Sequence, residues 1–225
     1  MSQILSDSGV VVFGLDITEG KNKNIHSFIC DVSDESQVVS VLNRIKEKTY
    51  VIDYLVNAAG MLTIGKPLEI IQVPIRQMDA IMRINLMSAF ILTKHCHPLL
   101  KNSSAGAAIV NISSEQAYKP QRGFAPYSIS KAAINALTQS AAREFLADKI
   151  RVNALAFGTV KTNILNSYIT DDEEIDRIFA YKDEFIPLGI IQPENAAEIV
   201  RFLLSDKAKH ITGEIIQANS GNCLL

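Results

Sequence analysis

The sequence predicts an α/β fold in which a mostly parallel sheet is covered by helices on both faces. Two observations lead to this prediction. Short runs rich in β-branched and aliphatic residues alternate along the chain with longer stretches of helical periodicity, and strands that alternate with helices form crossover units with parallel pairing. Polar residues also stand directly after most of these runs, where open sheets of this kind bind their ligands.

Six strands are expected, and four longer helices between them. The strands occupy Val10–Leu15, His26–Cys30, Tyr54–Val56, Ala108–Ile112, Arg151–Ala156 and Glu214–Gln217. The helices occupy Glu35–Glu47, Pro74–Leu100, Pro126–Ala147 and Pro193–Ser205. The sequence contains no repeat, low-complexity segment or linker, so its 225 residues are expected to form one domain over residues 1–225.

Helix ends carry local signals. Asp34 followed by Gln37 resembles a capping box for the helix that begins at Glu35. Thr170 with Glu173 makes the same pattern before a shorter helix over Glu174–Tyr181. At the N-terminus, residues 2–8 are expected to be the end of a helix, with Gly9 after it as a C-cap glycine.

Composition excludes several classes of function. The net charge is −2 and the basic residues are scattered, which argues against nucleic-acid binding. Apolar runs stay short of the roughly 18 residues that a membrane span needs, and the N-terminus lacks a secretory signal pattern. The three cysteines are far apart, which favours a reducing, cytoplasmic location without disulfides or a zinc site. His95 and His97 are two apart and so do not share a helix face, and no metal site is expected.

The strongest chemical signal is Tyr127 with Lys131. Residues four apart lie on one helix face, and an ammonium beside a phenol lowers the tyrosine pKa. Pro126 favours a helix start at this point, where the helix dipole also stabilises an anion. A tyrosine tuned in this way can act as a general acid or base. Taken alone, the pattern is more often a surface pair.

Other polar residues accompany this pair. Ser114 follows the strand Ala108–Ile112, and its hydroxyl could hydrogen-bond a substrate oxygen there. Asn57 begins the segment Asn57-Ala58-Ala59-Gly60 after another strand. Asn85 lies inside an apolar helical stretch and needs hydrogen-bond partners, either in a site or in a structural contact between helix and loop.

Together these residues resemble the short-chain dehydrogenase/reductase family over essentially the whole chain. The pieces that match, in family order, are Asp16, Asp31-Val32, Asn57-Ala58-Ala59-Gly60, Asn85, Ser114, Tyr127 with Lys131, and Asn153 leading to Gly158 and Thr162. The resemblance implies a Rossmann-type doubly wound sheet. It also implies hydride transfer between a nicotinamide cofactor and an alcohol or carbonyl carbon of a small-molecule substrate.

The same resemblance implies a role for each matching residue. Tyr127 would be the catalytic acid/base, and Lys131 would lower its pKa and bind the nicotinamide ribose. Ser114 would position the reacting oxygen, and Asn85 would hold a water in a proton relay. The remaining matches would line the cofactor: Asp31 and Val32 at the adenine, Asn57, Ala58, Ala59 and Gly60 in the loop after the third strand, and Gly158, Val160 and Thr162 along the nicotinamide and pyrophosphate.

Cofactor, substrate and assembly follow as expectations. A carboxylate at Asp16 would pair with a ribose 2′-hydroxyl and repel a 2′-phosphate, which favours NAD over NADP. The stretch between Thr162 and Pro187 is similar to dihydro-dihydroxybenzoate dehydrogenases, which implies a cyclic dihydrodiol as a possible substrate. Members of the family are usually homodimers or homotetramers, so a homo-oligomer is expected.

The N-terminus departs from the family pattern. The glycine-rich turn that binds the pyrophosphate should stand ~20 residues before the acidic residue, but Gly9 and Gly14 are the glycines that precede Asp16. We therefore expect the family's first strand and this turn to be absent from the chain. The N-terminal strand–helix–strand unit should then be displaced, re-paired or mobile. An alternative is a truncated or degenerate member that acts as a non-catalytic binding or assembly subunit.

Overall fold

The strands form two separate parallel sheets. The computed structural model describes residues 1–20 and 22–224. The larger sheet has the order β3-β4-β5-β6, with β3 (Tyr54–Asn57), β4 (Ala108–Ser114), β5 (Arg151–Phe157) and β6 (Ile215–Ala218). The smaller sheet pairs β1 (Val12–Asp16) with β2 (Ile25–Ile29). All six expected strands are present, and the α/β class with parallel pairing is confirmed.

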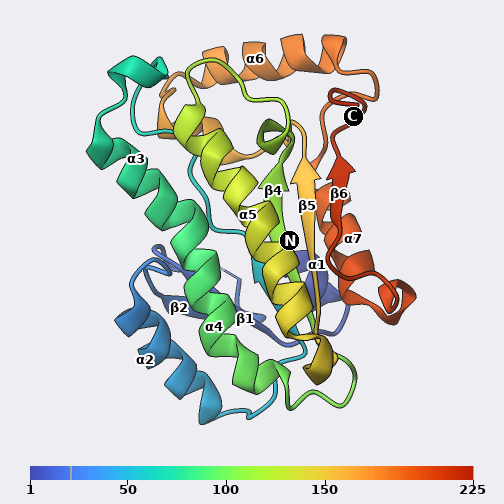
Figure 1. Cartoon of the computed structure of the whole chain (residues 1–225). Coiled ribbons are helices and arrows are strands. Elements are labelled where there is room, and N and C mark those ends of the chain that lie inside the picture. The colour runs from blue at the N-terminus through green and yellow to red at the C-terminus, as the bar shows by residue number, and fades with distance from the viewer. Residues whose placement is uncertain (21, 225) are drawn as a thin grey trace.

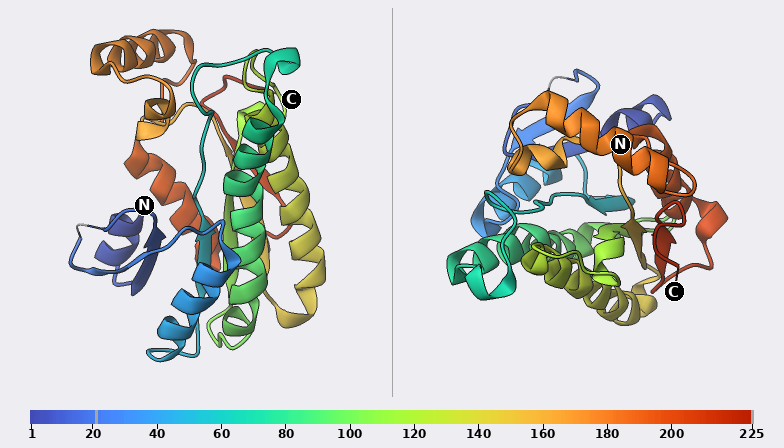
Figure 2. Two further views of the ribbon diagram at one scale, coloured as in Figure 1. Left: turned by 90° about the vertical axis from the view of Figure 1, so that its left-hand side faces the viewer. Right: turned by 90° about the horizontal axis from the view of Figure 1, so that it is seen from above.

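Helices cover both faces of the larger sheet. On one face lie α4 (Ser88–Leu100) and α5 (Ala125–Glu144), and on the other lies α7 (Pro193–Leu204) (Figure 1). The edge-on view in Figure 2 shows the sheet between these two layers. The remaining helices are α1 (Ser2–Asp7), α2 (Glu35–Lys46), α3 (Ile75–Met82) and α6 (Asp172–Phe185). Short 3₁₀ turns are η1 (Ile70–Gln72), η3 (Glu115–Ala117), η4 (Leu146–Asp148), η5 (Asn163–Ser167) and η6 (Asp206–Ala208).

Strand β4 divides its side chains between the two helix layers. Successive strand residues point to opposite faces, and Ile109 joins the buried cluster on the α2, α4 and α5 side. Ala108 and Val110 join the cluster formed with α7. Every residue of β4 pairs with a residue of β5, from Ala108 with Arg151 to Ser114 with Phe157. Because β4 and β5 are buried on both faces, they form the rigid centre of the molecule.

The helix expected over Pro74–Leu100 is continuous but changes its winding. A π-helical turn, η2 (Arg83–Met87), separates α3 from α4. Such turns are rare and are frequent at functional sites. Here the turn contains Asn85, a buried polar residue whose side chain bonds outside its own helix.

The N-terminal unit lies apart from the larger sheet. Gly9 has a φ of +83°, and its N–H donates to the carbonyl of Ser6 while the N–H of Val10 donates to that of Leu5. This is a Schellman ending, as the sequence predicts. Strand β1 pairs with β2, and within the described residues no ladder joins it to β3. The described residues therefore form no single continuous sheet, as expected, but whether this unit is displaced, re-paired or mobile stays a prediction.

Within residues 1–20 and 22–224, the two sheets are held together by shared hydrophobic cores and not by backbone hydrogen bonds between strands. On one side, Phe13 and Leu15 of β1 and Leu55 of β3 pack against the same buried cluster. On the other side, Leu5 of α1 and Val56 of β3 pack against the cluster around α7. Apolar contact is less directional than backbone pairing, so this junction is the weaker part of the fold.

The capping predictions had different outcomes. Asp34 accepts from the N–H groups of Ser36 and Gln37, so the start of α2 is confirmed. At α6 the capping residue is Asp171, whose carboxylate accepts from the N–H of Glu173. The expectation for Thr170 was wrong because the adjacent carboxylate takes this position, and the helix begins two residues earlier than predicted. No helix among residues 1–20 and 22–224 is long and apolar enough to span a bilayer.

Hydrogen exchange should separate the two sheets. Central strand β5 is paired on both sides and should open only with the whole domain, whereas β1 is paired on one side. We expect the amides of residues 12–16 to exchange about 100-fold faster than those of residues 151–157, after correction for intrinsic rates. Measurement by mass spectrometry on short peptides would test this. Equal protection of the two strands would contradict it.

Candidate active site

The end of β4 places one serine toward the candidate site and its neighbour away from it. Ser113 turns to α5, where its hydroxyl donates to Asn135 Oδ1 at 2.6 Å. Ser114 is the last residue of β4. It caps the 3₁₀ turn η3, where its Oγ accepts from the N–H of Gln116 at 3.2 Å. Of the two serines, Ser114 is the one whose side chain lies near enough to the Tyr127 phenol to lower its pKa.

Tyr127 and Lys131 lie one turn apart near the start of α5, as predicted. Pro126 stands in the first turn of this helix. Tyr127 is 7% exposed and Lys131 is 4% exposed, so this is not a surface pair. Lys131 Nζ lies 5.6 Å from the centre of the Tyr127 ring and donates to the carbonyl of Ile112 at 2.7 Å. The lysine thus joins α5 to β4 beneath the phenol.

Burial controls the protonation of this pair. Burial raises the pKa of Tyr127 to about 12, while the Ser114 side chain lowers it and the negative charge of Glu115 raises it further. Burial also lowers the pKa of Lys131 to about 8. The sequence led us to expect a tyrosine pKa shifted toward neutrality by Lys131. The structure shows the opposite direction, because desolvation dominates and the ammonium bonds to Ile112 rather than to the phenol oxygen.

Asn85 connects the helix of Tyr127 to the loop after β3. Its Oδ1 accepts from the N–H of Met61 at 2.7 Å, and its Nδ2 donates to the carbonyl of Met61 and to Ser130 Oγ, both at 2.9 Å. Ser130 Oγ in turn donates to the carbonyl of Tyr127 at 2.7 Å. The structure therefore realises the contact between helix and loop that the sequence left open.

The segment Asn57–Gly60 has a buried and an exposed part. Asn57 is buried, and its Nδ2 donates to Asn111 Oδ1 at 2.8 Å, which ties β3 to β4. Its Oδ1 is buried without a partner among the described residues. Ala58, Ala59 and Gly60 are exposed. A Cβ built at Gly60 would lie 3.5 Å from Lys131 Nζ, so this loop passes directly over the lysine.

The two acidic cofactor candidates belong to the smaller sheet. Asp16 ends β1 and is exposed, and its Oδ1 accepts from the N–H and the hydroxyl of Thr18. Asp31 follows β2, and its Oδ1 accepts from the N–H and hydroxyl of Ser33. Val32 packs against the adjacent hydrophobic cluster. Both carboxylates are held by local turns with their side chains open to solvent.

Three further candidates follow β5. Gly158 has no room for a side chain, because a Cβ there would lie 2.9 Å from the Cα of Asn219. Val160 forms an isolated parallel bridge with Ile191. Thr162 is exposed and its hydroxyl accepts from the N–H of Ile164 at 3.4 Å. These residues lie at the carboxyl end of the sheet.

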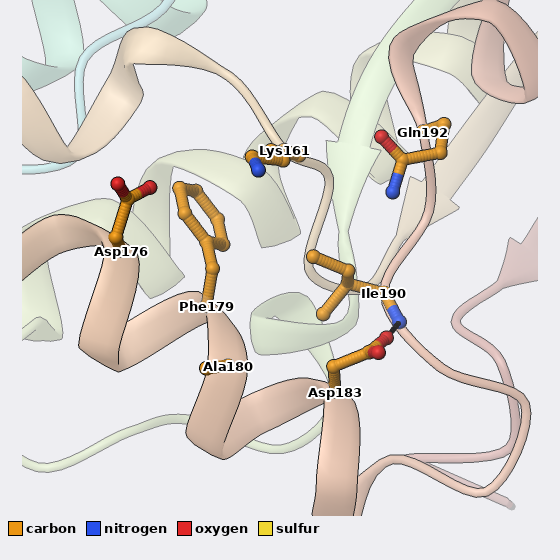
Figure 3. A pocket seen from close by; sticks show the side chains of 7 residues that line it. All are labelled: Lys161, Asp176, Phe179, Ala180, Asp183, Ile190 and Gln192. Atoms are coloured by element: carbon orange, nitrogen blue, oxygen red, sulfur yellow. Dashed lines mark hydrogen bonds between the residues drawn. The ribbon is translucent and has the colours of Figure 1, made fainter.

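Helix α6 covers this end of the sheet, where the strand arrows of Figure 1 point. Ile175 and Phe179 of α6 belong to the same buried cluster as Tyr127. A cavity of about 420 Å³ lies along α6 and is lined by Lys161, Asp176, Phe179, Ala180, Asp183, Ile190 and Gln192 (Figure 3). Tyr127 does not line it. In this arrangement α6 therefore closes the space over the phenol.

Two residues near the reacting groups escaped sequence reasoning. Ser130 is fully buried between Asn85 and the Tyr127 carbonyl. Glu115 directly follows Ser114, and its carboxylate influences the phenol. Its position directly after Ser114 could have identified it as a candidate, because residues that follow the strands of an open sheet lie on the side where ligands bind.

These residues fit a dinucleotide at its two ends. The exposed Asp16 carboxylate suits a ribose diol, and the buried Lys131 ammonium with the open Gly60 loop suits a second ribose. The sequence contains no pair of glycines separated by one residue. The G-x-G pattern that binds a pyrophosphate in dinucleotide-binding folds is therefore not found in it.

Comparison with known proteins agrees with this geometry. Residues 14–222 match the family model described as enoyl-(acyl carrier protein) reductase. The chain is 33% identical over 201 residues to 2,3-dihydro-2,3-dihydroxybenzoate dehydrogenase of Escherichia coli, covering 87% of this chain and 79% of that protein. It is 30% identical over 206 residues to a 3-oxoacyl-(acyl-carrier-protein) reductase of Thermotoga maritima, covering 90% of this chain and 79% of that protein.

Solved structures give the same result. Ligand-free aldohexose dehydrogenase of Thermoplasma acidophilum superposes with a TM-score of 0.89 at 27% identity, covering 98% of this chain and 87% of that one. The 3-ketoacyl-(acyl-carrier-protein) reductase of Brucella melitensis, complexed with NADH, gives 0.78 at 26% identity, covering 90% and 80%. Because residues 14–222 match the family model and Ser114, Tyr127 and Lys131 lie together at one strand end, the chain belongs to the short-chain dehydrogenase/reductase family of oxidoreductases.

Proposed function

We propose that this chain transfers hydride between NAD(H) and an alcohol or carbonyl carbon, with Tyr127 as the acid/base. The observation that carries the proposal is the buried Tyr127–Lys131 pair, one helical turn apart and beside Ser114. A cyclic dihydrodiol is the substrate class that we favour. Its support is the similarity to the Escherichia coli enzyme, whose name gives such a substrate.

Each residue has a separate task in this proposal. Ser114 hydrogen-bonds the reacting oxygen and fixes its distance from Tyr127. Tyr127 is protonated at neutral pH because burial raises its pKa to about 12, so it is ready to donate a proton to a carbonyl oxygen. Lys131 binds the ribose and Asn85 fixes the loop and helix around it. The nicotinamide supplies the hydride when it is bound.

Oxidation of an alcohol requires the phenolate instead. A charge on Lys131 stabilises this anion, and rising pH removes that charge because the pKa of Lys131 is about 8. Lys131 and Tyr127 therefore act as one coupled acid–base unit. Exposed apolar residues on α4 and α5 (Phe90 and Ile129) support the further proposal of a homo-oligomer formed through these helices.

Tyr127→Phe should abolish turnover. The change removes the proton donor but keeps the ring that packs under α6, so kcat should fall by at least about 10³-fold while cofactor affinity stays unchanged. Steady-state kinetics and a fluorescence titration with NADH would measure the two quantities. Tyr181→Phe, at an exposed position on α6, serves as the control and should keep full activity. Turnover that survives in Tyr127→Phe would remove the tyrosine from the mechanism.

Asp16 should determine the choice between the two nicotinamide cofactors. We expect saturable binding of NADH that is tighter than binding of NADPH. Asp16→Asn keeps the shape but removes the charge, and should reduce the ratio of the two affinities by about 10-fold. Calorimetric titration with both cofactors would measure this ratio. A wild-type chain that binds neither cofactor would favour the alternative of a non-catalytic binding or assembly subunit.

Lys131→Met should change the pH dependence of stability. The native pKa of about 8 lies below the usual 10.5, so between these values the unfolded chain holds more protons and wild-type stability rises with pH. Below pH 8 the full cost of burying the ammonium is present. From pH 7 to 9.5 the wild type should gain about 2 kcal/mol relative to the Met variant, as measured by urea unfolding. A pH-independent difference would refute this account.

A further inference from the structure

Glu115 carries an unexplained buried acceptor next to the reacting groups. It is the residue after Ser114 and the first residue of η3. Its Oε1 accepts from Asn222 Nδ2 at 2.8 Å. Its Oε2 is buried, and no donor among the described residues reaches it. An unpaired buried carboxylate oxygen costs free energy, so its presence needs an explanation.

The surroundings of Glu115 keep this oxygen free. Asn222, which binds Oε1, is itself held by Lys119, whose Nζ donates to the Asn222 carbonyl at 3.3 Å. Lys182 of α6 lies near enough to lower the pKa of Glu115, but its Nζ donates to Thr159 Oγ1 at 3.3 Å. One carboxylate oxygen is therefore committed to the C-terminal loop, and the neighbouring cation bonds elsewhere.

The carboxylate also lies on the side of the chemistry. Its turn η3 packs against α5, the helix of Tyr127, where Ser128 Oγ donates to Gln116 Oε1 at 3.2 Å, and the charge of Glu115 raises the pKa of Tyr127. Burial is the main cause that raises the pKa of Glu115 itself. An acceptor in the turn that directly follows Ser114 is suited to a donor on the substrate rather than to an anion.

We propose that Glu115 Oε2 accepts a hydrogen bond from a second hydroxyl of the substrate, next to the one that reacts. Glu115 is then a specificity-determining residue that selects vicinal diols over simple alcohols. This inference rests on the proposed function, since Ser114 and Tyr127 must hold the reacting oxygen. A diol places one oxygen between these two residues and presents the neighbouring hydroxyl to the carboxylate.

The experiment compares two matched probes, trans-cyclohexane-1,2-diol and cyclohexanol, in the presence of NAD. Dissociation constants come from ligand-detected NMR titration, and kcat/KM comes from NADH formation. The wild type should prefer the diol in both measurements. Glu115→Gln keeps the size of the side chain and should reduce the preference by about 10- to 100-fold, because a hydrogen bond to a charged group is lost. Its affinity for cyclohexanol should stay within about 3-fold.

Two further variants separate the possible failures. Asn222→Ala removes the contact to Oε1 but leaves Oε2, so the preference for the diol should remain. Tyr127→Phe should keep the binding preference while it loses turnover. If Tyr127→Phe stays active, the proposed function fails. If the wild type binds both probes equally, or Glu115→Gln weakens both to the same extent, the role of Glu115 is overturned while the proposed function stands. Equal binding of the two probes by the wild type overturns the role of Glu115 even if a variant does not fold.

Discussion

The hydrogen bond from Lys131 to the Ile112 carbonyl is the constraint on which the site depends. It joins the N-terminal part of α5 to the C-terminal part of β4. The helix that carries Tyr127 is thereby fixed against the strand that carries Ser114. The bond is made by a charged group inside the core, where losing a partner is costly. Because β4 is held in register by β5 along its whole length, the position of the lysine is set by the most rigid part of the fold. The positions of Asn85, Ser130 and the Gly60 loop follow from it.

The same rigidity does not extend to the residues expected at the adenine end. Asp16 and Asp31 lie on a two-stranded sheet that is joined to the rest by apolar packing rather than by a ladder. Side chains of Phe13 and Leu55 share one cluster, but apolar contacts leave more freedom of orientation than backbone pairing. The residues proposed for catalysis and those proposed for the adenine end therefore lie on sheets that differ in rigidity. In this arrangement, binding of a dinucleotide across both sheets would also tie them together.

Local chemistry could be predicted from the sequence where it depends on neighbours along the chain. The strands, the Asp34 cap and the Gly9 helix ending follow from short patterns, and the Tyr127–Lys131 pair follows from helical spacing. Thr170 failed because Asp171, one residue away, is an equally good capping residue, and a pattern does not rank the two. The direction of the Tyr127 pKa could not be predicted, because it depends on burial under α6 and on Glu115, which are tertiary features. The partners of Asn85 were open for the same reason.

Burial under α6 also explains how the two protonation states are balanced. In the closed arrangement burial raises the pKa of Tyr127 to about 12 and lowers that of Lys131 to about 8, so the pair in which both side chains are neutral is favoured above pH 8. Moving α6 away would admit water and shift both pKa values back toward their ordinary ranges. In the proposed complex, a polar substrate under α6 replaces that water and meets Ser114 and the Glu115 oxygen that has no partner among residues 1–20 and 22–224. The polar side chains of this site therefore obtain their remaining hydrogen-bond partners from a ligand bound between α6 and β4. A ligand with two adjacent oxygens satisfies more of these side chains than a ligand with a single oxygen.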